Sequence, residues 1–398
     1  MSNERTAPIA YVSPDRQIHV MDGDGVSHPQ TAGGDPGLMW GTWGGGSQTA
    51  HSWPSWSPDG RHLACFAVAD EHFAHALVLE VGGMQSAAVS TLEGRLPIYL
   101  YWSPDGDHLA LLTQQVQTGG DRLQLAVARA SHAGSEVLLA EGSPLFFTWV
   151  GERLAAFVGD PATGETRLSI FSSDAKGPRI LLPGRPGNFC APVWADDHLV
   201  YVLQHGTRAT VVASRLDAPE PRTLEQLDGL VALLRSPDGR SVARAVATGG
   251  DGTPYRSLAV LDVQSGTSRP ISDEPCLAFF WLPDGSGLIT ARVDTARNLM
   301  RWYRVGLDGQ QHHVCDMFPT RDFGFYLRFF EQYAQSHAIV DPGSKNLLLV
   351  GGLVGQGDPH RTRALWEVPL DGGEPDRLAE AVFGVYGPYV DDVADDEE

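Results

Sequence analysis

Cysteine is scarce in this sequence, and long apolar runs are missing. The four cysteines (Cys65, Cys190, Cys276 and Cys315) lie far apart and form no Cys-x-x-Cys pair, so we expect buried free thiols rather than a redox or metal motif. No apolar run approaches the roughly 18 residues that cross a bilayer, and residues 1–10 contain no apolar core of signal-peptide length. We therefore expect a cytoplasmic protein without a membrane partner.

Basic residues are also few. The 29 Lys and Arg residues are outnumbered by 49 Asp and Glu residues, which gives a formal net charge of -20. Such a surface repels phosphate backbones, so no nucleic acid partner is expected, and the plain interpretation of the charge is solubility. Residues 391–398 are mostly acidic, and we expect them to form a disordered tail after a single domain that spans residues 1–390.

Recognisable catalytic and metal-binding patterns are absent as well. No Gly-x-Ser-x-Gly occurs, which argues against a serine hydrolase. His312 and His313 are adjacent, so on a strand they would point to opposite faces and could not hold one ion together. We assign no catalytic, cofactor-binding or metal-binding residue, and we favour a protein that is not an enzyme. A site assembled from several repeats would not be visible in the sequence.

A repeated phrase is the main positive feature. An aromatic residue followed by Ser-Pro-Asp-Gly and an apolar strand occurs at residues 56–60 and 102–106, and related forms occur at residues 235–239 and 281–285. In such a turn Pro presets φ, Asp bonds to its own backbone and Gly accepts a positive φ. A period of roughly 40 to 50 residues indicates repeated supersecondary units. We therefore predict an all-β protein, a β-propeller of four-stranded antiparallel blades.

The first repeat is incomplete, and its missing part lies at the other end of the chain. Residues 8–12, 17–22 and 26–30 supply three strands, and residues 382–386 can supply the inner one, which would close the ring. Counted in this way the propeller has eight blades, and merging two units would give seven. The eighth unit is the most divergent, and we place its inner strand near residues 327–330. Further apolar runs follow at 338–340, 347–350 and 364–368, which is one run more than the repeat needs, so the register of this unit is open.

These repeats resemble those of TolB-type propellers. The resemblance rests on the Ser-Pro-Asp-Gly turns and on the opening Ile9-Ala10-Tyr11-Val12, and it extends to the propeller domains of the prolyl oligopeptidase and dipeptidyl peptidase families. It implies the fold rather than the function, because the shared residues are turn and packing residues. TolB-type proteins are typically periplasmic and carry an additional domain, so their role is not expected here. No hydrolase domain is expected either.

The recurrent tryptophans have a structural interpretation. They occupy the same position in each repeat, so we expect them to pack between neighbouring blades; they are Trp56, Trp102, Trp149, Trp194 and Trp281. The long irregular segments 33–52, 316–325 and 351–362 should gather in one sector, on the face opposite the Ser-Pro-Asp-Gly turns. Aromatic and Arg side chains on loops over a rigid scaffold favour binding.

This loop sector is the predicted functional site. The candidate partner-binding residues are Trp40, Trp43, Phe318, Arg321, Phe323, Tyr326, His360 and Arg361. The predicted function is a non-enzymatic scaffold that binds a protein partner; its oligomeric state is open, and a monomer is compatible with the sequence. In one alternative, Trp40 and Trp43 fold inward and plug the channel mouth. In others, the protein is an enzyme or small-molecule binder with its site at that mouth, or a self-assembling structural component.

Overall fold

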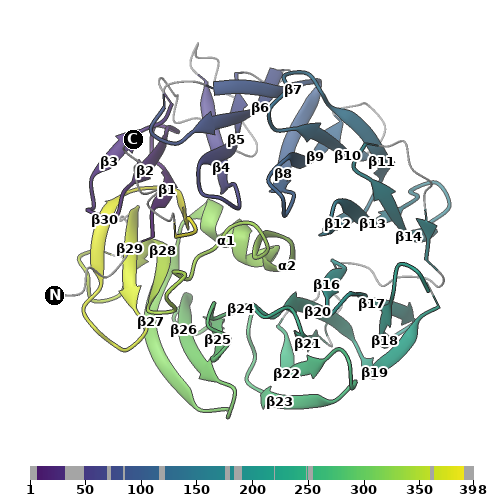
Figure 1. Ribbon diagram of the computed structural model, residues 1–398. Coiled ribbons are helices and arrows are strands. Elements are labelled where there is room, and N and C mark those ends of the chain that lie inside the picture. Colours follow the sequence, from purple (N-terminus) through teal and green to yellow (C-terminus); the bar gives the residue numbers. More distant parts are fainter. Residues whose placement is uncertain are drawn as a thin grey trace, which may run out of the picture.

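The chain forms a nearly all-β ring. The computed structural model describes residues 7–31, 49–69, 73–83, 86–115, 122–174, 180–182, 191–218, 220–247, 249, 254–358 and 363–389. These residues form 31 β-strands and two short α-helices. The sheets stand side by side around a central channel, as in a β-propeller (Figure 1). No helix in this described part of the chain is long and apolar enough to span a membrane.

The first half of the chain forms successive four-stranded sheets. Their strands are β4 (Ala50–Trp56), β5 (His62–Val68), β6 (Phe73–Glu80) and β7 (Ser86–Glu93); β8 (Arg95–Trp102), β9 (His108–Gln115), β10 (Arg122–Arg129) and β11 (Val137–Gly142); and β12 (Leu145–Val150), β13 (Arg153–Gly159), β14 (Thr166–Ser172) and β15 (Ile180–Leu181). In each sheet the first strand lies nearest the channel (Figure 1).

The pattern continues in the second half. The next two sheets consist of β16 (Val193–Ala195), β17 (His198–His205), β18 (Arg208–Ser214) and β19 (Arg222–Asp228), and of β20 (Leu230–Arg235), β21 (Ser241–Ala247), β22 (Arg256–Asp262) and β23 (Ser268–Ser272). A seven-stranded sheet follows, with β24 (Ala278–Trp281), β25 (Gly287–Asp294), β26 (Leu299–Gly306), β27 (Gln311–Pro319), β28 (Asn346–Leu353), β29 (Ala364–Pro369) and β30 (Asp376–Glu380).

The two ends of the chain share one sheet. Its order is β3-β2-β1-β31, with β1 (Ile9–Val12), β2 (Ile18–Met21), β3 (Ser27–Pro29) and β31 (Phe383–Tyr386). β31 pairs antiparallel with β1, from Ile9 opposite Tyr386 to Val12 opposite Phe383. The innermost position in this sheet is therefore held by a strand from the C-terminal end of the chain.

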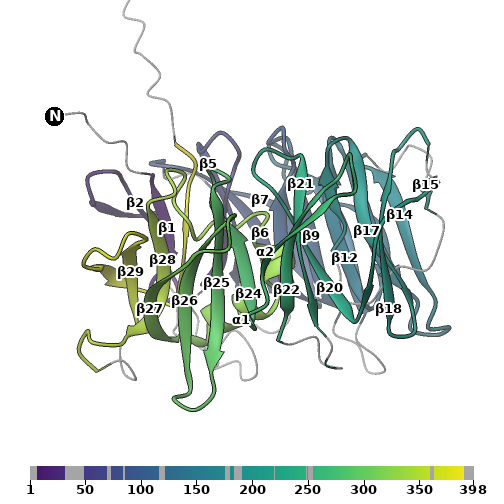
Figure 2. The same ribbon diagram turned by 90° about the horizontal axis from the view of Figure 1, so that it is seen from below.

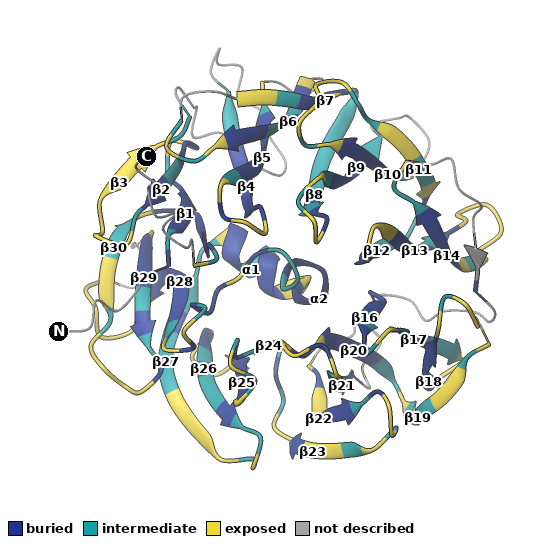
Figure 3. Cartoon of the chain, in the orientation of Figure 1, coloured by how far each residue is buried: buried dark blue, intermediate teal, exposed yellow. Residues whose placement is uncertain are grey.

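The Ser-Pro-Asp-Gly turns form as the sequence predicts. In the turn after β4, Ser57 Oγ donates to Asp59 Oδ1 at 2.5 Å. Asp59 Oδ1 also accepts from the backbone N–H of Arg61 at 3.0 Å. Gly60 closes the turn with φ of 71°, in the left-handed region that favours glycine. The outermost strands of the sheets are largely exposed and the inner ones buried (Figure 3).

The main departure from the expected pattern is helical. Residues 327–330 do not form an inner strand: they belong to α1 (Arg321–Arg328) and to the start of α2 (Phe330–Tyr333). Thr320 caps α1, since its hydroxyl accepts from the Phe323 N–H at 3.2 Å. The strand-like pairing in this region lies later, in the bridges Ala338–Tyr386 and Val340–Leu347. Both helices lie inside the channel, within the height of the ring (Figures 1 and 2).

Three of the recurrent tryptophans link their own sheet to the one before it. The indole N–H of Trp102 donates to the Ser55 carbonyl at 2.9 Å, and that of Trp149 donates to the Tyr101 carbonyl at 3.1 Å. Trp281 makes the same contact with the Leu234 carbonyl at 3.1 Å. The expected packing role is confirmed for these tryptophans. The bonds recur because the same position in each repeat faces the same backbone position of the preceding sheet.

Trp56 provides a natural comparison, because its buried indole N–H has no hydrogen-bond partner in the described structure. Trp102→Phe should remove an inter-sheet hydrogen bond, whereas Trp56→Phe loses no such bond. We expect the free energy of unfolding to fall by about 1 to 2 kcal/mol more in Trp102→Phe than in Trp56→Phe. Urea unfolding measures both, and equal losses would contradict the assignment.

Candidate functional site

The inner strands leave a structural problem at the channel. Each inner strand is the edge of its sheet, so the backbone N–H and C=O groups on its channel side have no strand partner. Buried groups of this kind need hydrogen bonds from elsewhere. Helices α1 and α2, which we call the channel plug together with residues 334–337, supply side chains to these edges.

Consecutive residues of α2 contact different sheets. Gln332 accepts from the Phe147 N–H at 3.3 Å and donates to the Phe147 carbonyl at 2.9 Å, as a neighbouring strand would. The Tyr333 hydroxyl donates to the Ile98 carbonyl at 2.9 Å. In return, the Tyr99 hydroxyl donates to the Gln332 carbonyl at 2.9 Å. The plug is thus hydrogen-bonded to β8 and β12 at the same time.

Glu331 extends this set of contacts to another side of the channel. Its carboxyl accepts from the Tyr255 hydroxyl at 2.9 Å, and the other carboxyl oxygen, Oε2, is buried without a hydrogen-bond partner in the described structure. Burial disfavours the carboxylate and raises the pKa of Glu331 to about 8, although the bond from Tyr255 opposes the shift. The side chain therefore carries a proton at neutral pH.

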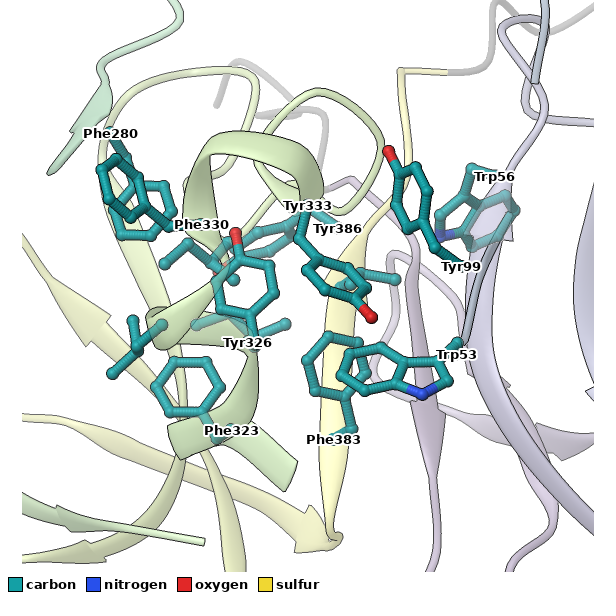
Figure 4. Close-up of a cluster of buried hydrophobic side chains, with 14 of the residues drawn as sticks. Trp53, Trp56, Tyr99, Phe280, Phe323, Tyr326, Phe330, Tyr333, Phe383 and Tyr386 are labelled. Atoms are coloured by element: carbon teal, nitrogen blue, oxygen red, sulfur yellow. The ribbon is translucent and has the colours of Figure 1, made fainter. Parts of the chain in front are cut away.

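Aromatic rings fill the space around the plug (Figure 4). The Tyr333 ring stacks on Trp53 with centroids 4.7 Å apart, and Trp53 also contacts Phe383 at 4.7 Å. On the other side, Tyr326 stacks on Phe280 at 5.7 Å. These rings are almost completely buried, so the plug is part of the hydrophobic core rather than a loop lying over it.

An ion pair fixes the start of the plug. Arg16, in the turn between β1 and β2, donates to Asp322 of α1 at 2.7 Å, and both side chains are at most 10% exposed. The Arg16 carbonyl also accepts from the His51 N–H at 2.9 Å. The first turn of α1 is thus tied to the sheet that contains both chain ends.

A pocket of about 360 Å³ lies above the plug. Its aromatic lining is Tyr101, Trp149, Trp194, Phe280, Trp281 and Tyr326, and these rings come mainly from the ends of different inner strands. The prolines of three Ser-Pro-Asp-Gly-type turns, Pro104, Pro237 and Pro283, line it too. The pocket is therefore on the face of these turns, which the sequence analysis did not expect to hold a site.

The polar part of the pocket is small. At the floor of the pocket, the Thr148 hydroxyl donates to the side-chain carbonyl of Gln335 at 2.8 Å, so each of these two polar groups already has a partner. His337 is fully buried, and burial lowers its pKa to about 3, so it is neutral. Arg235 is exposed on the wall. Among the residues that the structure describes, no Asp or Glu lines this pocket.

The part of the predicted loop sector around residues 321–326 is helical rather than an irregular loop. Phe323 and Tyr326 are fully buried in α1, so the expectation that they lie on an exposed loop is wrong: their apolar rings fill the channel instead. Arg321 is exposed at the start of α1, and Phe318 is partly buried in β27. A role in partner binding stays a prediction for these two residues.

The other candidates fall outside the description. Trp40, Trp43, His360 and Arg361 lie outside the described residues, so the choice between binding and plugging by the two tryptophans stays open. The channel itself is plugged by residues 321–333. Their sequence held a signal for this, since Phe323, Tyr326, Leu327 and Phe330 follow the i, i+3, i+4, i+7 spacing of a buried helix face.

No cluster typical of a metal site occurs in the described parts of the chain, where no three His, Cys, Asp or Glu residues gather. The cysteines there, Cys65, Cys276 and Cys315, are free, and burial raises the pKa of each thiol to about 12. Such thiols are unreactive at neutral pH.

Comparison with known proteins identifies the fold alone. No protein-family model and no curated sequence matches the chain. A eukaryotic initiation factor structure is 12% identical, with 97% of this chain and 99% of that one covered and a TM-score of 0.56. A prolyl endopeptidase is 12% identical, with 86% and 50% covered and a TM-score of 0.55. TolB from Acinetobacter baumannii is 13% identical, with 77% and 62% covered and a TM-score of 0.42.

The chain has a β-propeller fold. It spans about half the length of the prolyl endopeptidase that it matches. The expected likeness to peptidase propellers is thus confirmed for the fold. Sequence identities this low do not indicate an activity, a substrate or a partner for this chain.

The raised pKa of Glu331 predicts a pH-dependent stability. An unfolded Glu has its ordinary pKa of 4.5, whereas the folded one is about 8, so in this range the folded protein holds a proton that the unfolded chain has lost. This contribution to stability is complete below pH 4.5 and is lost as the pH rises to about 8. His337 acts in the opposite direction, since its lowered pKa reduces stability as the pH falls below 6.5.

Glu331→Gln isolates the first effect, because His337 affects both proteins equally. We expect the free energy of unfolding of the wild-type protein to fall by a few kcal/mol more than that of Glu331→Gln between about pH 5 and pH 8. Urea unfolding at several pH values measures this difference. Parallel pH profiles for the two proteins would show that Glu331 is ionised at neutral pH.

Proposed function

We propose that this protein is a closed eight-bladed propeller that binds a small organic molecule at the mouth of its plugged channel. For the blade count, the seven-stranded sheet would contain two units, β24–β27 and residues 338–340 with β28–β30. The pairing of β31 with β1 would then close the ring. This is the small-molecule alternative considered from the sequence; binding of a protein partner by Phe318 and Arg321 stays a prediction.

The observation that carries the proposal is the pocket over the plug. Its volume of about 360 Å³ lies within the range of small-molecule sites, which are concave, mostly apolar and provided with a few polar groups. Flat aromatic walls suit a ligand with a planar or ring-shaped apolar body. The floor is held in place by hydrogen bonds from the plug to β8 and β12, so little ordering would be needed on binding.

A neutral fluorescent probe tests this proposal. We expect N-phenylnaphthylamine to bind at one saturable site per chain. Ala338→Trp should block that site, because Ala338 is exposed and lines the pocket. Ala338 pairs through its backbone, where its carbonyl accepts from the Tyr386 N–H. Affinity should fall by about tenfold or more, which corresponds to about 1.4 kcal/mol.

The matched control is Val137→Trp, on the outer strand β11, where Val137 is 38% exposed. It adds the same side chain far from the pocket and should leave binding unchanged. Thermal unfolding of both variants checks that they are folded. Absence of saturable binding to the wild-type protein, or an equal loss of affinity in the two variants, would contradict the proposal.

A further inference from the structure

A charged residue takes the place of the recurrent tryptophan in one of the repeats with a Ser-Pro-Asp-Gly turn. At the position of Trp102, Trp149 and Trp281, the unit that contains β20 has Arg235 instead. The Trp281 indole of the following sheet still donates to the Leu234 carbonyl at 3.1 Å. The substitution removes the indole that would reach back to the preceding sheet, and it places a guanidinium on the pocket wall instead.

Arg235 is exposed, and its guanidinium has no acceptor among the described residues. It lies back over its own turn, because a Cβ added at Gly239 would lie 2.5 Å from Arg235 Nη2. The nearby carboxylate of Asp238 is already bonded to Ser236 Oγ at 2.6 Å and to the Arg240 N–H at 3.0 Å. Within the described structure Arg235 makes no side-chain hydrogen bond or ion pair, so its donors are available to a ligand.

Tyr101 provides a second polar group in the same pocket. It lies at the end of β8, whereas Arg235 lies at the end of β20, and the strands β12 and β16 lie between them around the ring (Figure 1). Burial raises the pKa of Tyr101 to about 12, and the charge of Arg235 opposes that shift. The two groups therefore interact across the pocket mouth. The Tyr101 hydroxyl has no hydrogen-bond partner among the described residues.

The pocket thus has one basic side chain on its wall within a strongly acidic protein, and the charge of that side chain also acts on the Asp238 carboxylate of the same turn. Arg235 is its one charged lining residue in the described structure, since His337 is neutral and no carboxylate is present. The net charge of -20 acts at longer range, where physiological salt screens it over about 8 Å. Among the described lining residues, the charge closest to a ligand in the pocket is that of Arg235.

We propose that the pocket selects an organic anion, with its acidic group bound by Arg235 and Tyr101 and its apolar body against the tryptophan rings. This inference rests on the proposed function and adds the chemical class of the ligand. Arg presents a planar set of donors that fits carboxylate, sulfonate and phosphate oxygens. A hydrogen bond to a charged group is stronger than a neutral one, so its loss should cost about tenfold to a hundredfold in affinity.

Two probes that share one ring system test the charge. Anilinonaphthalenesulfonate carries a sulfonate, and N-phenylnaphthylamine does not. We expect Arg235→Gln to weaken binding of the sulfonate probe by at least about tenfold and to change binding of the neutral probe by less than about twofold. Arg235→Lys should restore part of the loss, since it keeps the charge without the planar donors. Tyr101→Phe should weaken only the sulfonate probe, by several-fold.

Arg240→Gln is the matched control, because Arg240 is exposed on the same turn and does not line the pocket. It removes the same charge and should leave both probes unaffected. Ala338→Trp should block both probes, which shows that they share the site. If Arg235→Gln weakened both probes equally, left the sulfonate probe unchanged, or matched the Arg240→Gln effect, anion recognition would be overturned. Failure of the neutral probe to bind at all would instead refute the proposed function.

Discussion

The structure depends on how the edges of the inner strands are satisfied. A ring of sheets leaves unpaired backbone groups along its channel. Here the side-chain amide of Gln332 bonds to both the N–H and the C=O of Phe147, and the Tyr333 hydroxyl bonds to the Ile98 carbonyl. The preceding residue, Glu331, accepts from the Tyr255 hydroxyl. The plug therefore stabilises several sheets at once. It also closes the channel partway, which turns an open mouth into a pocket with a floor.

Much of the fold could be predicted from local sequence. The Ser-Pro-Asp-Gly turns form where their turn chemistry requires them, and Trp102, Trp149 and Trp281 pack between sheets as their period indicates. The repeat pattern predicts a strand at residues 327–330, whereas the spacing of the apolar residues around them is helical, and the helix is what forms. The burial of Glu331 could not be predicted, because its partner Tyr255 is 76 residues away.

The candidate site was harder to predict, for a physical reason. The pocket is assembled from the ends of β8, β12, β16, β20 and β24 together with the plug, and no short motif marks such a set. Long loops were a reasonable place to look, but Phe323 and Tyr326 are core residues. The repeats themselves contain one indication of the site. Arg235 stands where other repeats have tryptophan, and a charged residue at a packing position indicates that the side chain has a role other than packing between sheets.

The most direct measurement is a crystal structure of the protein soaked with anilinonaphthalenesulfonate. The account predicts one probe above α2, with its rings against Trp149 or Trp281 and its sulfonate within hydrogen-bonding distance of Arg235. It also predicts α1 and α2 inside the channel, with Gln332 bonded to the edge of β12. A channel without these helices, or a probe bound only outside this pocket, would contradict the account.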